Sequence, residues 1–393
     1  MRVRVAGDVD AGFGRVADEF RRNFAVRGDI GAAVAVYRDG RPVVDLWGGL
    51  RDAVRGLSWE RDTLVPVFST TKGVAGLVVA SLRSNGLLDW DERVAHYWPE
   101  FAAGGKDEIT VRQLLAHEAG LAVLDTQLHT RHLRDHDALA AILAAQRPAW
   151  VPGTRRGYHA ISLGLYQNEL ARRVDPQRRT IGRILAEEFA APLGLSIYIG
   201  LPDDVDLDRV AVLGRLGVRA SLAQLPGMSW PLARQLANRS SATYRALANP
   251  ALARADRWTQ RYVLTPELPS SNGVAVPRSI AALYGAAAIA APKLPIDAVT
   301  LAELAAPVTA PAQTDVLLLV RRAYSLGFSR PVPEFWFGSR AGRAYGAAGL
   351  GGSLGFADPD AQLGYAYAPN RLGIRLSDDP RETALRRAVY ACL

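Results

Sequence analysis

Cysteine is almost missing from this 393-residue sequence, because the single one, Cys392, stands next to the last residue. One cysteine excludes an intramolecular disulfide and a metal site built from cysteines. The sequence also lacks any stretch of about 18 apolar residues, the length of a membrane-spanning helix. Its first residues, MRVRVAGDVDAGFGRV, contain no apolar segment of the kind found in secretion signals. We therefore expect a cytoplasmic protein with no membrane partner.

Lysine is scarce as well, since only Lys72, Lys106 and Lys293 occur among the 47 basic residues. Arginine is used almost everywhere that a plain positive charge suffices, so a retained lysine points to a role that needs a removable proton. The formal net charge is +8, but the basic residues are scattered and form no stripe with interleaved aromatic residues. We therefore expect no nucleic-acid partner.

Segments with the features of β-strands lie near both ends of the sequence. Residues 32–38 and 42–48 are joined through Asp39-Gly40, a pair typical of tight hairpin turns. A proline at a first-turn position predicts a final helix that begins at residue 380. Five further short strands, separated by glycine, proline and aspartate, are predicted before that helix at 323–328, 333–338, 344–346, 353–357 and 363–368.

The middle of the sequence has apolar residues at helical spacing, without the strand–helix alternation that builds a parallel sheet. The predicted fold is therefore of the α/β class, with an antiparallel β-sheet flanked by helices. Residues 1–65 and 315–393 form the sheet domain, residues 66–314 form an inserted, mostly helical domain, and the active site lies at their interface. Helices are predicted over residues 11–27, 70–85, 110–117, 136–145, 160–173, 181–191, 231–247 and 277–290.

The strongest chemical signal is Ser69-Thr70-Thr71-Lys72 at the start of an apolar helix. Residues three apart share one helix face, so the Lys72 amine can reach the Ser69 hydroxyl. The helix dipole favours a deprotonated lysine at this end, and such a lysine can activate a serine nucleophile. The alternative is that Ser69 only caps the helix and Lys72 is exposed. A helix that is apolar nearly all round argues against that alternative, because its first turn is then buried.

Three segments, in order along the chain, resemble the serine β-lactamase superfamily, and above all its class C-like branch, the family VIII carboxylesterases. PVFSTTKGVAGL contains the Ser-x-x-Lys motif of that family as Ser69 and Lys72. VPGTRRGYHAISLGLY places the family's second-motif tyrosine at Tyr158. GAAGLGGSLGFADPDAQLGYAYAPNRLG resembles the segment that carries the third motif, so the similarity spans most of the chain.

The resemblance implies a catalytic role for each of these residues. Ser69 is then the nucleophile, Lys72 and Tyr158 share the acid–base work, and the backbone amides of Ser69 and Leu350 form the oxyanion hole. We further expect Lys72 to favour the ionised form of Tyr158 and so to bring its pKa toward neutral pH. Neither a cofactor nor a metal is expected.

The third motif departs from the family pattern. The position at which relatives carry a basic or aromatic residue is Ala347 here, and no histidine follows His159 to replace it. This loss argues against ordinary β-lactam recognition, while Ala347 and Gly349 are still expected to contact the substrate, because Gly349 lets the strand approach it closely. His159 and Trp336 are weaker candidates for substrate contacts. The alternatives are that the His159 ring faces elsewhere and that Trp336 belongs to a buried strand.

The predicted function is ester hydrolysis through an acyl-enzyme on Ser69. One alternative is an acyltransferase of small-molecule or natural-product biosynthesis, which passes the acyl group to an alcohol or amine. Another is a catalytically silent binding protein, against which the presence of Ser69, Lys72 and Tyr158 argues. The expected partner is a small-molecule acyl ester or amide, joined by an alcohol or amine acceptor in the first alternative. The oligomeric state is left open.

Overall fold

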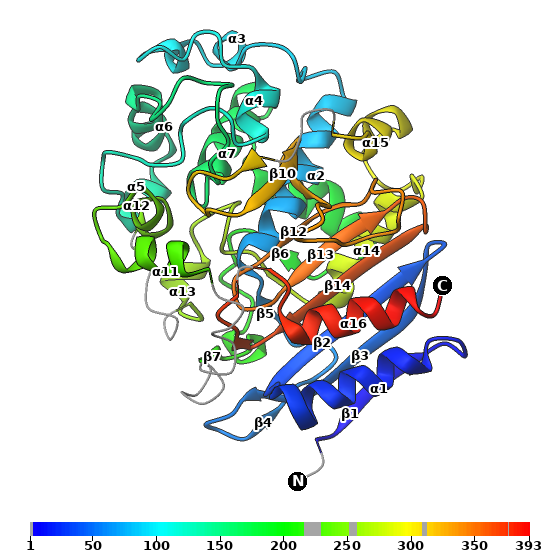
Figure 1. The fold of residues 1–393 in the computed structure, drawn as a ribbon. Helices are drawn as coiled ribbons and strands as arrows, with labels where there is room; N and C mark the ends of the chain where they lie inside the picture. The colour runs from blue at the N-terminus through cyan, green and yellow to red at the C-terminus, as the bar shows by residue number, and fades with distance from the viewer. Residues whose placement is uncertain (1–2, 216–228, 251–257, 309–312, 376) are drawn as a thin grey trace.

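An antiparallel sheet of ten strands forms the centre of the computed structural model, which describes residues 3–215, 229–250, 258–308, 313–375 and 377–393. The strands follow the order β1-β3-β2-β14-β13-β12-β11-β10-β9, and β4 pairs with β3 (Figure 1). The predicted antiparallel sheet flanked by helices is thus confirmed. The strands are β1 Val5–Val9, β2 Gly31–Arg38, β3 Arg41–Asp52, β4 Leu57–Ser58, β9 Gln313–Thr314, β10 Arg321–Ser325, β11 Phe328–Arg330, β12 Tyr345–Ala348, β13 Leu354–Asp358 and β14 Leu363–Pro369.

The hairpin predicted at Asp39-Gly40 joins β2 and β3. Both residues have positive φ, 50° for Asp39 and 74° for Gly40, as a tight turn between twisted strands requires. On its other side β2 pairs with β14 along most of its length, beginning with Arg38 opposite Leu363. Segments from the two ends of the chain are therefore neighbours in the middle of the sheet.

Residues 323–328 do not form the single strand that their apolar character predicted. They contain the end of β10, a turn and the start of β11, which pair as an antiparallel hairpin. Leu326 and Gly327 make the turn with φ values of 51° and 90°. The glycine is the residue that permits this reversal, and it breaks a run that otherwise reads as continuous.

Residues 333–338 form no strand, although their aromatic residues favoured one. An isolated bridge between Val332 and Phe335 closes a tight turn in this segment. Pro333 has no amide hydrogen to give to a neighbouring strand. Phe335 and Phe337 are nevertheless buried, so the segment covers the core as a loop.

The two faces of the sheet contact separate hydrophobic cores, because successive side chains of a strand point in opposite directions. Within β2, Val34 belongs to one core and Ala35 to the other. Helices α1 (Gly14–Arg22) and α16 (Pro380–Tyr390) lie side by side over the first face (Figure 1). On the opposite face α14 (Pro277–Ala288) packs against β2, β13 and β14. The predicted final helix is confirmed as α16.

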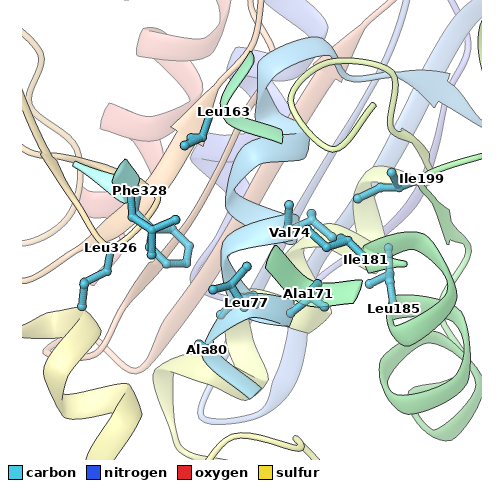
Figure 2. Packing of buried hydrophobic residues seen from close by; sticks show 14 of the residues in the cluster. Val74, Leu77, Ala80, Leu163, Ala171, Ile181, Leu185, Ile199, Leu326 and Phe328 are labelled. Atoms are coloured by element: carbon cyan, nitrogen blue, oxygen red, sulfur yellow. The ribbon is translucent and has the colours of Figure 1, made fainter. Parts of the chain in front are cut away.

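Helix α2 (Thr71–Ser84) runs through the core of the second face. Nearly all of its residues are buried. Figure 2 shows Val74, Leu77 and Ala80 of α2 among apolar side chains that include Phe328 of β11. Because α2 is covered on all sides, its first turn carries side chains into the interior and not into solvent.

The other helices lie between the two groups of strands in the sequence. The single helix predicted over residues 231–247 is two helices, because Ser241 accepts the amide hydrogen of Tyr244 and caps a new one. None of the helices in the described parts of the chain is both long and apolar enough to cross a bilayer. These helices are α3 Val94–Tyr97, α4 Val111–Leu115, α5 Thr130–Arg134, α6 His136–Ala145, α7 Ser162–Val174, α8 Ile181–Ile184, α9 Ala191–Leu193, α11 Trp230–Ala237, α12 Ala242–Ala248, α13 Arg261–Leu264 and α15 Ala298–Ala305.

Candidate active site

Ser69 lies in a single 3-10 turn, Phe68–Thr70, directly before α2. Strand β5 (Val65–Pro66) leads into this turn and pairs with β8 (Val274–Ala275). Phe68 has a φ of 49°, a left-handed conformation that is strained for a bulky residue and recurs at functional sites. Phe68 is buried, and its ring packs on that of Trp258 with centroids 4.9 Å apart. This packing holds the strained residue and thereby places Ser69 at the helix N-terminus.

Lys72 is 2% exposed and lies in the first turn of α2. Its Nζ is 3.3 Å from Ser69 Oγ, 2.6 Å from the carbonyl oxygen of Ala160 and 2.9 Å from that of Ser270. Burial lowers the pKa of the Lys72 amine well below its usual 10.5, because the charged form is poorly solvated there. A neutral amine can donate its two hydrogens to the two carbonyls and direct its lone pair to the Ser69 hydroxyl. The alternative of an exposed Lys72 does not hold.

Tyr158 lies beside both of these residues. Lys72 Nζ is over the face of the Tyr158 ring, 4.7 Å from its centroid, and Tyr158 lines the same pocket as Ser69. Burial raises the pKa of Tyr158 to about 12, although the Ser69 hydroxyl acts on this pKa in the opposite direction. The prediction that Lys72 brings this pKa toward neutral is therefore wrong, because the effect of burial on the phenol dominates. Tyr158 is a protonated phenol at neutral pH.

The turn after β12 brings Leu350 to the segment that carries Ser69. The Gly349 amide donates to the Ser353 carbonyl at 2.8 Å, and Ser353 Oγ donates to the Val67 carbonyl at 2.8 Å. A Cβ at position 349 would lie 2.2 Å from the Val67 oxygen, so glycine is needed here for packing against this segment. Among the described residues the Leu350 amide has no acceptor, and Leu350 lines the same pocket as Ser69. An amide in this position is what an oxyanion hole requires.

A buried ion network supports this turn from behind. Arg381 donates to the Gly351 carbonyl at 2.8 Å and pairs with Asp379 at 2.8 Å and with Asp29 at 3.0 Å. The Tyr367 hydroxyl donates to Asp29 at 2.8 Å. The network joins the start of α16, the segment before β2 and the turn after β12, so it couples the packing of the chain ends to the position of the Leu350 amide.

Replacing Arg381 by methionine is expected to lower the free energy of unfolding by about 3–5 kcal/mol, because it leaves two carboxylates buried without their cation. Urea unfolding followed by circular dichroism measures the loss. Arg387→Met is the matched control, since Arg387 lies on the same helix and is exposed. Its expected effect is within about 0.5 kcal/mol. An equal loss in both variants would contradict a role specific to the network.

A cavity of about 90 Å³ opens beside Ser69. The structure brings three of the predicted site residues, Ser69, Tyr158 and Leu350, to its wall. Arg322 and Tyr324 of β10 were missed, because nothing in their local sequence connects them with residues so distant along the chain. The lining residues are Ser69, Tyr158, Leu247, Leu318, Arg322, Tyr324, Ser329, Phe335, Ala348, Leu350 and Ser377.

Tyr324 connects the pocket wall to a buried carboxylate. Its ring stacks on that of Tyr158 with centroids 5.9 Å apart and planes 24° apart, and its hydroxyl donates to Asp315 at 3.1 Å. Asp315 also accepts the amides of Leu317 and Leu318 at 2.9 and 2.8 Å. Burial raises the pKa of Asp315 and places that of Tyr324 well above its ordinary value. The hydrogen bond between Tyr324 and Asp315 therefore fixes the orientation of the Tyr324 ring, on which the Tyr158 ring stacks.

Two residues predicted to contact substrate lie outside this pocket. Ala347 is buried against α2, where a Cβ at position 73 would touch its methyl group at 3.4 Å. The next residue of the strand, Ala348, lines the pocket in its place, because neighbouring side chains of a strand point to opposite faces. Trp336 is 40% exposed and is not among the lining residues, whereas its neighbour Phe335 is.

His159 is the third predicted substrate contact that lies outside the pocket, because its ring is fully buried and forms structural hydrogen bonds. Nε2 accepts the Leu121 amide at 2.9 Å, and Nδ1 lies 2.7 Å from the Gly157 carbonyl, to which it must donate. Burial lowers the pKa of His159 to about 4, so the ring is neutral. The His159 amide in turn donates to Nδ1 of His117 at 2.9 Å, and the His117 ring lies 5.0 Å from that of Tyr158. Both histidines thus hold Tyr158 in place.

An antiparallel sheet covered by helices on both faces, with a buried helix that presents a serine and a lysine at its start, is β-lactamase/transpeptidase-like architecture. It places the chain in a class of serine enzymes. The chain belongs to the Beta-lactamase family, whose sequence profile matches residues 20–390.

Individual relatives are similar over nearly the whole chain. Esterase/beta-lactamase LipL of Mycobacterium tuberculosis (strain ATCC 25618 / H37Rv) is 34% identical over 377 residues, which cover 94% of this chain and 83% of that protein. A crystal structure of a family VIII carboxylesterase superposes with a TM-score of 0.88 at 38% identity, over 99% of this chain and 100% of the other. EstA from Arthrobacter nitroguajacolicus Rue61a superposes with a TM-score of 0.84 at 31% identity, over 100% and 98%. The predicted resemblance is confirmed, and the chain is an enzyme of the serine β-lactamase and esterase superfamily.

Proposed function

We propose that the protein is a carboxylesterase that hydrolyses small acyl esters through an acyl-enzyme on Ser69. The contact between Lys72 and Ser69 is the observation that carries this proposal. Burial lowers the pKa of the Lys72 amine and so favours its uncharged form. In that form its hydrogens have two carbonyl acceptors, and its lone pair can accept the hydrogen of the hydroxyl 3.3 Å away. A desolvated lysine of this kind is a competent base for a serine nucleophile.

In the acylation step, the Ser69 proton passes to Lys72 Nζ as Oγ forms a bond to the ester carbonyl carbon. The negative charge then develops on the carbonyl oxygen, where the amides of Ser69 and Leu350 stabilise it. These amides are fixed before the substrate arrives, by the strained Phe68 and by the turn bound to Arg381, so no reorganisation is needed when the charge develops.

The bond to the alcohol portion breaks next, and the leaving oxygen needs a proton. We assign this proton to the hydroxyl of Tyr158, because its raised pKa keeps it protonated and it lines the same pocket as Ser69. The ammonium formed on Lys72 lies over the Tyr158 ring and returns the proton to the phenolate. Deacylation reverses these roles, with water in place of the alcohol, and returns the proton to Ser69.

The small pocket favours short acyl chains. Its volume of about 90 Å³ is well below the several hundred Å³ typical of sites for larger ligands. Its wall combines apolar side chains such as Phe335 and Leu318 with a few polar groups. A butyryl ester is therefore a suitable probe.

Intact-protein mass spectrometry after incubation with p-nitrophenyl butyrate tests this function. We expect a butyryl adduct that maps to the peptide containing Ser69 and that clears in water as butyrate is released. A parallel incubation includes an alcohol or amine acceptor. An adduct that persists in water and disappears only with the acceptor would replace the hydrolase by an acyltransferase. No adduct and no turnover would contradict both.

A further inference from the structure

Arg322 brings a guanidinium into the active-site pocket from β10. The residue is only 8% exposed and lines the same pocket as Ser69. Its Nη2 donates to Ser377 Oγ at 2.6 Å, its Nη1 donates to the Arg321 carbonyl at 3.3 Å, and its Cζ is 5.1 Å from the ring centroid of Phe335. All three partners are neutral, so they orient the guanidinium without balancing its charge.

No carboxylate forms an ion pair with Arg322 in the part of the chain that the structure describes. The nearby acids of the segment before α16 have other partners, since Asp378 pairs with Arg386 and Asp379 with Arg381. Burying an arginine without an anion is costly, so a protein that keeps one in a pocket is expected to have a use for it. Arginine offers a planar, permanently charged set of donors that matches a carboxylate.

The position of Arg322 relative to the catalytic groups follows from the strand. Arg322 and Tyr324 are two residues apart in β10, so their side chains lie on the same face. Tyr324 stacks on Tyr158, the proton donor to the leaving oxygen in the proposed reaction. The charge of Arg322 also acts on Tyr158 and on Tyr324, opposing the effect of burial on each pKa. The guanidinium is therefore on the side where the alcohol portion of the ester leaves.

We propose that Arg322 binds an anionic group, a carboxylate, on the alcohol portion of the ester substrate. The inference rests on the proposed esterase function and adds a substrate class to it. The third-motif strand offers only alanines at this place, Ala347 facing α2 and Ala348 the pocket. The positive charge that recognises the substrate thus comes from a different strand, β10.

A pair of matched esters tests this assignment. 3-Butyryloxybenzoate and 3-butyryloxybenzamide share the acyl group and differ in the charge on the departing phenol. We expect the wild-type protein to have the higher kcat/KM for the benzoate. Arg322→Gln is expected to lower kcat/KM for the benzoate on the order of tenfold to a hundredfold, chiefly through KM, and to change that for the benzamide by less than about twofold. Arg322→Lys should keep part of the preference, because it keeps the charge.

Arg321→Gln is the control, since Arg321 precedes Arg322 in the strand, faces solvent and lies 3.6 Å from Glu334. It should leave both esters unchanged. Equal losses for the two esters in Arg322→Gln, or a wild-type protein that hydrolyses the benzamide with no preference for the benzoate, would overturn this inference alone. Failure of the wild-type protein to hydrolyse either ester, with no butyryl adduct, would overturn the proposed function itself.

Discussion

Ser69→Ala is expected to lose covalent acylation by p-nitrophenyl butyrate altogether and to lower ester hydrolysis by about 10⁴- to 10⁶-fold. The nucleophilic oxygen is the only atom that the change removes, and the half-buried position accommodates a methyl group. The backbone amide of residue 69, the strained Phe68 and the turn with Leu350 all remain. Mass spectrometry of the intact protein and the rate of p-nitrophenol release measure the two losses.

Ser329→Ala provides the matched control for this variant. Ser329 lines the same pocket and offers a second hydroxyl that an acyl group could reach. Its Cα pairs with that of Gly346 across β11 and β12, and it forms no hydrogen bond with Lys72 among the described residues. We expect Ser329→Ala to keep both the adduct and most of the activity. An adduct that persists in Ser69→Ala and disappears in Ser329→Ala would show that Ser329, and not Ser69, is the nucleophile.

Lys72→Met is expected to slow acylation of Ser69 by about 10²- to 10⁴-fold, the usual contribution of a general base. In the wild-type protein, kcat/KM should fall as the pH drops through the lowered pKa of Lys72, because the protonated amine cannot accept the Ser69 hydrogen. Lys72→Arg should be as slow as Lys72→Met, since a guanidinium stays charged. The pH profile of p-nitrophenyl butyrate hydrolysis separates these cases. High activity in Lys72→Arg would show that charge, and not basicity, is required.

Lys72→Met is expected to lower activity but to raise the free energy of unfolding at pH 7. The lowered pKa favours a neutral Lys72 amine in the folded protein, while the unfolded chain protonates it below its ordinary pKa of 10.5. Between these two pKa values the unfolded state binds the extra proton, so stability rises with pH by about 1.4 kcal/mol per pH unit for this group. Lys72→Met removes that slope and should be more stable at pH 7. Lys106, whose pKa is lowered to about 8 by burial, contributes equally to both proteins. Urea unfolding at two pH values therefore isolates Lys72, and parallel slopes would contradict its neutral state.

The centre of the site could be predicted because it depends on one helix. A separation of three positions places Lys72 on the same helix face as Ser69, and an apolar helix ensures that this turn is buried. Tyr158 and Leu350 followed from ordered motifs of a known family. Arg322 and Tyr324 could not be found in this way. They reach the pocket only because β10 pairs with β11 next to β12, and that pairing is a property of the assembled sheet.

The errors in the fold have similar physical origins. Residues 323–328 read as one strand because a single glycine, Gly327, is a weak local signal inside an apolar run. Residues 333–338 alternate buried and exposed aromatics as a strand does, yet within the described parts of the chain they pair with no neighbouring strand. The expected substrate contact of Ala347 was wrong because successive side chains of a strand point to opposite faces of the sheet. A difference of one residue therefore turns a side chain from the pocket to the core.

The pairing of β2 with β14 has a consequence for synthesis of the protein. A ribosome that has completed the hairpin around Asp39 must translate every segment between β3 and β14 before β14 emerges, which takes tens of seconds at about 5–20 residues per second. During that time the edge of β2, with its run of small and β-branched residues, has no native partner and is prone to pair with other chains. Ser69 and the Leu350 amide also meet only after the long segment between them has been translated. The nascent chain therefore lacks a complete active site and does not react with esters. The period before β14 emerges, when β2 is unpaired, is when a chaperone would be needed most.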